Sequence, residues 1–132
     1  MLRVDKIILA ILAIEHLGFG IYGFYSPEGI ADLTGYALNS EFAYSEIRAY
    51  YTLISGLGLM AFLAIFIHKL ARQTYILFSF MFGCIFLGRL ANYLLTGQMD
   101  NSIMIAMIAE ALVIVLSLWR LASSKNRSAV EV

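Results

Sequence analysis

Apolar residues occur along the chain in four long runs that are separated by shorter polar segments. A helix that crosses a membrane needs about 20 mostly apolar residues. Four stretches meet this requirement: residues 7–24, 47–67, 75–95 and 103–121. We therefore predict an all-α, polytopic membrane protein whose four transmembrane helices form an antiparallel bundle, as a single domain over residues 1–122.

The connection between the first and second spans is the longest and has the signals of a short helix. Pro27 suits the first position of a helix, Ser26 could cap its N-terminus and Gly35 could end it. We therefore predict a short extracytoplasmic helix over residues 27–34.

Basic residues mark the cytoplasmic side of membrane proteins. With both termini cytoplasmic, seven of the nine Lys and Arg residues fall on one side of the membrane: Arg3, Lys6, Lys69, Arg72, Arg120, Lys125 and Arg127. This distribution predicts an N-in, C-in topology. The polar segment 123–132 is then a cytoplasmic tail, which we predict to be disordered.

The composition supports a membrane protein and excludes several other classes. Hydrophobic residues make up 61% of the 132 residues and charged residues 14%, whereas soluble domains are about 45–50% apolar and about 25% charged. Nine basic and nine acidic residues leave no positive surplus for nucleic acid. One cysteine, Cys84, cannot form an internal disulfide. His16 and His68 lie roughly 15 Å apart along the membrane normal, too far to share one iron, so we expect no metal and no cofactor.

Five charged residues lie at unusual positions for a membrane protein. Glu15, Arg89 and Glu110 fall inside spans, and Glu46 and Arg48 begin the second span. At about 1.5 Å per residue, all five belong to the outer half of the bundle. Charges inside spans usually face a partner, the bundle interior or a wet cavity. The sequence therefore predicts a charged network in the outer half.

Arg89 needs an anionic partner because its guanidinium keeps its proton. Glu110 is the nearest carboxylate in depth, and its span follows that of Arg89 in the chain. We therefore predict an Arg89–Glu110 ion pair, with Glu15 as the neutral or proton-exchanging group. Such a pair can also fix the register of two helices without any chemistry, and that alternative stays open.

Aromatic residues gather at the same depth as these charges. Many tyrosines fit an aromatic belt at the membrane interface, but some share helix faces with the charges. A cavity with polar walls and aromatic sides would suit an amphipathic ligand whose anionic or hydroxylated head meets Arg48 or Arg89. The candidate ligand-binding residues are Glu15, Glu46, Arg48, Tyr50, Tyr51, Arg89, Tyr93 and Glu110.

Glycine recurs in the first three spans. The positions are Gly18, Gly20, Gly23, Gly56, Gly58, Gly83 and Gly88. Small residues let transmembrane helices approach each other closely, so we expect these glycines to serve packing.

Several short motifs follow one another over nearly all four spans: Tyr25-Ser26-Pro27-Glu28, Glu46-Ile47-Arg48-Ala49-Tyr50-Tyr51 with Gly56 and Gly58, Gly88-Arg89, Gly97 and Glu110. Through these residues the chain resembles a family of bacterial membrane proteins known as domain of unknown function 4345 (DUF4345). It departs from the family pattern at Thr52-Leu53 and Thr96-Gly97. The resemblance implies a four-span protein of a bacterial inner membrane, directs attention to Glu46, Arg48, Arg89 and Glu110, and implies no reaction.

Three functions fit these observations. The favoured one is a binding or accessory protein that holds a lipid, quinone or isoprenoid-like ligand, or a membrane partner, through the outer-half charges. The second is a small isomerase-like or hydrolase-like enzyme with Glu15 or Glu110 as the catalytic acid or base. The third is a dimeric proton-coupled exporter. Expected partners are membrane lipid, a lipophilic small molecule and a homo-oligomer or larger membrane complex, but not nucleic acid.

Overall fold

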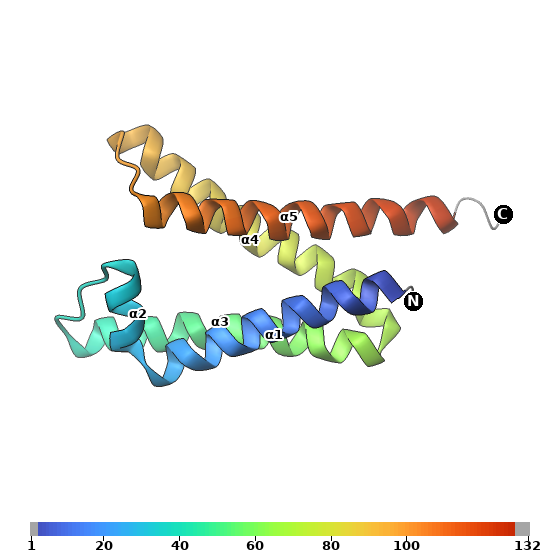
Figure 1. Cartoon of the computed structure of the whole chain (residues 1–132), viewed down its shortest axis with the longest axis horizontal. Helices are drawn as coiled ribbons and strands as arrows, with labels where there is room; N and C mark the ends of the chain where they lie inside the picture. The colour runs from blue at the N-terminus through green and yellow to red at the C-terminus, as the bar shows by residue number, and fades with distance from the viewer. Residues whose placement is uncertain (1–2, 129–132) are drawn as a thin grey trace. The chain divides into compact units, whose positions relative to one another are not determined.

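The computed structural model describes the backbone of residues 3–128 and the side chains of residues 3–123. This part of the chain consists of helices and connections, without a strand (Figure 1). The helices are α1 (Arg3–Tyr25), α2 (Pro27–Thr34), α3 (Glu41–Phe66), α4 (His68–Thr96) and α5 (Asn101–Ser128). Four of them, α1, α3, α4 and α5, are long and apolar enough to cross a membrane. The predicted all-α membrane protein with four spans is confirmed.

The chain divides into two compact units, Met1–Ala71 and Arg72–Val132. The first unit contains α1, α2, α3 and the first residues of α4, and the second contains the rest of α4 and α5. Within each unit the two long helices run antiparallel (Figure 1). A single bundle over residues 1–122 and the N-in, C-in topology stay predictions.

The two long helices of the first unit pack with their backbones close together. A Cβ atom added to Gly58 of α3 would overlap the backbone of Leu17 in α1. In the same way, a Cβ atom on Gly20 of α1 would overlap the backbone of Ser55 in α3. These two positions tolerate only glycine, and the expected packing role is confirmed for them.

The short helix α2 covers the residues predicted for it. Pro27 occupies its first turn, and Gly35 ends it in the left-handed conformation (φ 72°), which a residue without a side chain adopts easily. The expected capping by Ser26 is wrong, since the Ser26 side chain forms no capping hydrogen bond. Its backbone (φ −128°, ψ 68°) departs from the extended conformation of a capping residue.

Helix α2 is held against α3 by a small apolar cluster. Ile30 of α2 packs with Ile47 and Tyr51 of α3, and the partly buried Leu38 packs against this cluster. Burial of these side chains fixes the long connection between α1 and α3 in place.

The polar turn between the second and third spans is much shorter than the sequence suggests. Only Ile67 separates α3 from α4, so Lys69 and Arg72 belong to the first turns of α4. Polar residues at the edge of an apolar stretch are compatible with a helix that extends beyond the hydrocarbon region. The limits of apolar runs therefore mark spans and not helix ends.

The last helix also extends beyond its apolar run. Helix α5 continues to Ser128, and the disorder that we predict for residues 123–132 stays a prediction. No Gly or Pro occurs between the end of the span and Ser128, and nothing in this stretch ends the helix. Residues 129–132 of the predicted tail lie outside the described residues.

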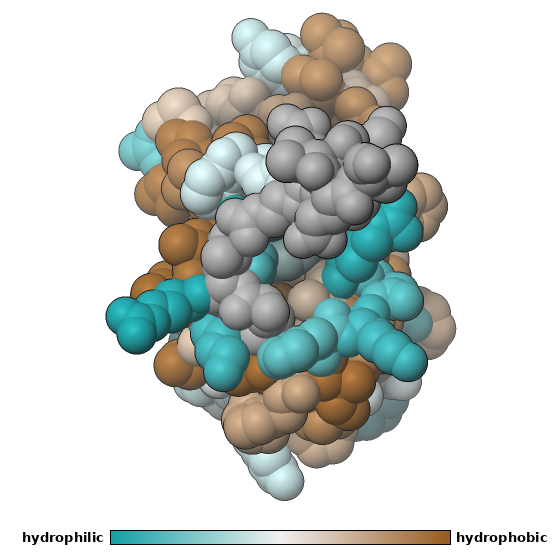
Figure 2. Space-filling view, turned by 90° about the vertical axis from the view of Figure 1, so that its right-hand side faces the viewer, coloured by the Kyte–Doolittle hydropathy of each residue, from teal (hydrophilic) through white to brown (hydrophobic). Residues whose placement is uncertain are grey.

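Large apolar side chains are exposed on every long helix. Examples are Ile14 of α1, 75% exposed, and Leu95 of α4, 86% exposed. Figure 2 shows hydrophobic residues (brown) over much of the visible surface, beside hydrophilic ones (teal). Water-soluble proteins rarely expose so much apolar area, whereas lipid tails accept it. The surface agrees with a membrane protein.

Candidate functional site

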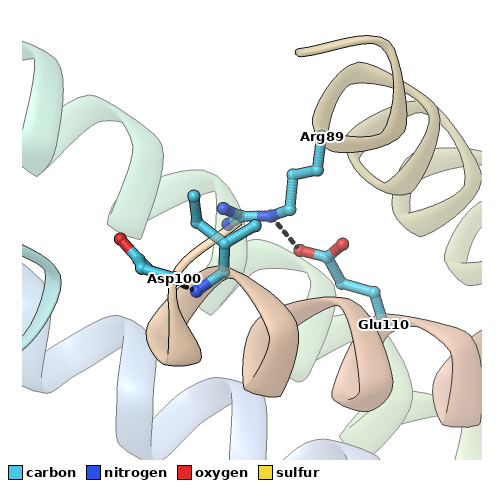
Figure 3. A network of polar contacts seen from close by, with 4 residues as sticks. Arg89, Asp100 and Glu110 are labelled. Carbon is cyan, nitrogen blue, oxygen red and sulfur yellow. Dashed lines mark hydrogen bonds and ion pairs between the residues drawn. The ribbon is translucent and has the colours of Figure 1, made fainter. Parts of the chain in front are cut away.

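The second unit contains the ion pair that the sequence predicts. The Arg89 Nε–H donates a hydrogen bond to Glu110 Oε1 at 2.8 Å, from α4 to α5 (Figure 3). This distance is typical of a hydrogen bond between charged groups, which is stronger than one between neutral groups. The pair therefore links the two long helices of this unit.

The two partners differ in exposure. The Glu110 side chain is 8% exposed and the Arg89 side chain 37% exposed. Glu110 Oε2 is buried and has no hydrogen-bond partner among the described residues. The carboxylate is thus enclosed in the protein, while a large part of the guanidinium remains accessible.

Arg89 uses only part of its guanidinium in the pair. Its two terminal nitrogens point away from Glu110, toward the side where α5 begins (Figure 3). Within the described part of the chain, the bond to Glu110 is the one polar contact of the Arg89 side chain. The planar fork of donors at the end of the side chain is therefore available to an acceptor.

An open hollow of about 330 Å³ lies beside the guanidinium. Its lining residues are Ile85, Gly88, Arg89 and Asn92 of α4 and Ile103 of α5. The hollow extends over Gly88, where a Cβ atom would have no neighbour within 4 Å among the described residues. An apolar wall with a few polar groups is typical of small-molecule sites, and this volume is at the small end of their range.

The start of α5 is fixed by a capping residue. Asp100 Oδ1 accepts a hydrogen bond from the Ile103 N–H at 2.8 Å (Figure 3). Sequence reasoning missed this role, although an acidic residue just before an apolar run is a known signal for a helix start. It also missed Ile103 as a lining residue, because an isoleucine in a span carries no mark of function.

Three of the predicted charged residues lie in the first unit. Glu15 of α1 and Glu46 and Arg48 of α3 are exposed on their helices, and none of them makes an ion pair with a described residue. The Arg48 guanidinium instead lies 5.8 Å from the centre of the Tyr44 ring. Such a contact is favourable for a cation near an aromatic face. The network of five charges stays a prediction.

The three predicted tyrosines have different surroundings. Tyr51 is 6% exposed, lies in the apolar cluster that holds α2, and meets the Phe19 ring edge-on at 5.6 Å between centres. A Cβ atom on Gly23 would overlap the Tyr51 ring. Tyr51 is therefore packed on all these sides, while Tyr50 and Tyr93 are exposed. Their part in ligand binding stays a prediction.

Fold and site together define a small polytopic α-helical membrane protein with an ion pair between two of its spans. The model of the family described as "Domain of unknown function (DUF4345)" matches residues 4–121. The chain belongs to this family, and the resemblance seen in its motifs is confirmed. No curated protein and no solved structure matches the chain.

Proposed function

We propose that this protein binds an amphipathic membrane ligand in the hollow of its second unit. Arg89 binds the polar head of the ligand, and the apolar residues Ile85 and Ile103 contact its hydrophobic part. One observation carries this proposal: the terminal nitrogens of Arg89 lie beside an open hollow and bind no described residue, while Glu110 holds the Nε atom.

A purely structural role explains the pair less well. Arginine and a carboxylate bind each other best through two parallel hydrogen bonds, which would use the fork of the guanidinium. Arg89 makes one such bond and leaves its fork accessible at the hollow. Unpaired donors of a charged group are costly inside a membrane. A ligand or lipid that accepts hydrogen bonds at this point removes that cost.

The setting of the site follows from the distribution of basic residues. We infer a bacterial inner membrane as the location, with both termini in the cytoplasm. With this topology, Arg89 and Glu110 lie in the outer half of the membrane. The ligand is then a component of the outer leaflet or enters the site from it.

Native mass spectrometry of the protein, extracted gently from its own membrane, tests the proposal. We expect the wild-type protein to retain a lipophilic molecule. The variant Gly88→Leu places a side chain into the hollow and leaves the ion pair intact, so it should lose that molecule. The variant Gly83→Leu is the matched control, because it adds the same side chain to α4 at a position that also has no neighbour within 4 Å and lies outside the hollow.

Two results would contradict the proposal. One is a wild-type protein that carries no small molecule. The other is retention of the same molecule by the wild type and by Gly88→Leu. In either case the ion pair is a structural link between the helices.

A membrane enzyme is the second candidate, because the Oε2 atom of Glu110 is buried without a partner among the described residues. A carboxylate with one free oxygen could transfer a proton. Glu110 is not among the residues that line the hollow, however, and a catalytic base must reach its substrate. Binding is therefore the better-supported function. Turnover that is lost in Glu110→Gln, with the ligand still bound, would favour the enzyme.

A further inference from the structure

The charges around the hollow of the second unit do not add up to an anion-binding site. Arg89 is the one cationic lining residue, and Glu110 already neutralises it through the 2.8 Å hydrogen bond. Asp100, which caps α5 through the lining residue Ile103, adds a second carboxylate at this end of the unit. One cation and two carboxylates leave this region with a negative balance.

We infer that the ligand has an uncharged head with carbonyl oxygens. This inference rests on the proposed function and names the class of ligand. Because the guanidinium nitrogens only donate hydrogen bonds, the head must accept them. A carbonyl oxygen accepts hydrogen bonds through two lone pairs and brings no charge into the site.

An anionic head would be opposed at the same position. Such a head must leave water or the headgroup region, and this step is unfavourable unless a cation compensates for it. Glu110 already neutralises the charge of Arg89. Repulsion from Glu110 and Asp100 acts against a further negative charge. An uncharged carbonyl group avoids both effects and still occupies the fork of Arg89.

The other lining residues agree with such a head. Asn92 supplies an amide that can donate or accept one more hydrogen bond, and Ile85, Gly88 and Ile103 form an apolar surface. Quinones combine carbonyl oxygens with an apolar body and no charge, and so do uncharged glycerolipids with ester carbonyls.

Binding of defined probes to the purified full-length protein in detergent tests the inference. Three probes are titrated by native mass spectrometry: decylubiquinone, dioctanoylglycerol and dodecyl phosphate. We expect one of the two uncharged probes to bind the wild type at least about tenfold more tightly than dodecyl phosphate. Which of the two binds more tightly distinguishes a quinone from a glycerolipid as the source of the carbonyl group.

The variant Glu110→Gln gives the sharper result. It keeps an oxygen that can accept from the Arg89 Nε–H, but it removes the negative charge. Affinity for dodecyl phosphate should then rise at least about tenfold, because the full charge of Arg89 becomes available. Affinity for the uncharged probe should change less than about threefold. Asp100→Asn keeps a capping side chain and should also raise the affinity for dodecyl phosphate, by a smaller factor. This variant provides a test should Glu110→Gln fail to fold.

The outcomes separate the two claims. Tighter binding of dodecyl phosphate by the wild type, lost in Gly88→Leu, would overturn the inference and leave the proposed function standing. The inference would also be overturned if neither Glu110→Gln nor Asp100→Asn changed the ratio of the affinities for the uncharged probe and for dodecyl phosphate. Failure of all three probes to bind the wild type, or equal binding by Gly88→Leu, would instead overturn the proposed function itself.

Discussion

The two units of this protein connect their long helices in opposite ways. In the first unit, α1 and α3 approach each other closely at Gly20 and Gly58, where a Cβ atom would overlap the facing backbone. In the second unit, a Cβ atom on Gly83 or Gly88 would have no described atom within 4 Å, and two long charged side chains link α4 to α5. Close glycine contacts fill the space between helices, whereas a link through long side chains leaves room for a hollow.

This difference suggests a division of tasks between the units. Small residues let two helices approach until their backbones are in contact, which leaves little space between them. A link between long charged side chains instead places hydrogen-bond donors and acceptors beside open space. If the two interfaces differ in this way, the same kind of substitution should have different effects on stability in the two units.

The variant Gly58→Leu should destabilise the protein more than any other substitution considered for the two interfaces. The added side chain would overlap the backbone of Leu17, which cannot move without separating α1 from α3. Overpacking of this kind costs about 3 kcal/mol. The free energy of unfolding, measured by circular dichroism during titration with SDS, reports the effect.

The matched substitution in the second unit is Gly83→Leu. Because no described atom lies within 4 Å of the added Cβ, its effect should be below about 1 kcal/mol. An equal loss of stability in the two variants would show that Gly83 is also a close-contact position in the folded protein. The contrast between the units would then be wrong.

The variant Arg89→Ala should have the next largest effect. It leaves the Glu110 carboxylate, 8% exposed, without its partner. Removal of one member of a buried pair costs about 3–5 kcal/mol, and the partial exposure of Arg89 reduces this to about 2 kcal/mol. Unfolding by SDS measures this loss as well.

Two further variants make the Arg89 experiment specific. Arg48→Ala in the first unit removes an exposed arginine without an ion pair to a described residue, and it should change the stability by less than about 0.5 kcal/mol. The double variant with Glu110→Ala should recover part of the loss caused by Arg89→Ala, because it also removes the buried carboxylate that would otherwise lack a partner. Additive effects of the two single substitutions would mean that the residues do not interact.

The ion pair was predictable from the sequence, and the hollow was not. Depth along consecutive spans and the permanent charge of arginine were sufficient to pair Arg89 with Glu110. Which of the guanidinium nitrogens binds, and whether the carboxylate or the arginine is buried, depends on side-chain geometry that residue spacing does not contain. The hollow arises at Gly88, which sequence reasoning assigned to packing like the other glycines.

The surroundings of Tyr51 and the positions of the helix ends were likewise not predictable from residue spacing. Helical periodicity could place Tyr51 near the charged residues, but it could not show that Ile30 of the short helix α2 would cover this ring. Apolar runs located the four spans because the thickness of the hydrocarbon region fixes their length. They gave no signal for the continuation of α5 to Ser128, since polar residues in water can extend a helix as well as end it.

A smaller effect on stability is expected at Ser117, in the second unit. Its hydroxyl is fully buried and has no hydrogen-bond partner among the described residues. Ser117→Ala should therefore stabilise the protein, by up to about 1 kcal/mol, because it removes a buried polar group that is not satisfied. Ser79→Ala is the control on α4, since the Ser79 hydroxyl donates to the Tyr75 carbonyl at 2.8 Å. A loss of stability in Ser117→Ala would show that its hydroxyl has a partner, such as a water molecule.

Effects of similar or smaller size are expected at two capping residues, one in each unit. Ser40 caps α3 through a 3.2 Å bond from the Ala43 N–H, and Asp100 caps α5 through a 2.8 Å bond from the Ile103 N–H. Replacement by alanine should cost about 0.5 kcal/mol at Ser40 and about 1 kcal/mol at Asp100, because a charged acceptor near a helix N-terminus is the stronger one.

The dependence on salt distinguishes the charged cap from the neutral one, since salt screens exposed charges. The loss at Asp100 should shrink when the ionic strength rises from about 0.01 M to about 1 M, while the loss at Ser40 stays constant. Equal salt dependence at both residues would mean that the charge of Asp100 adds nothing to the cap.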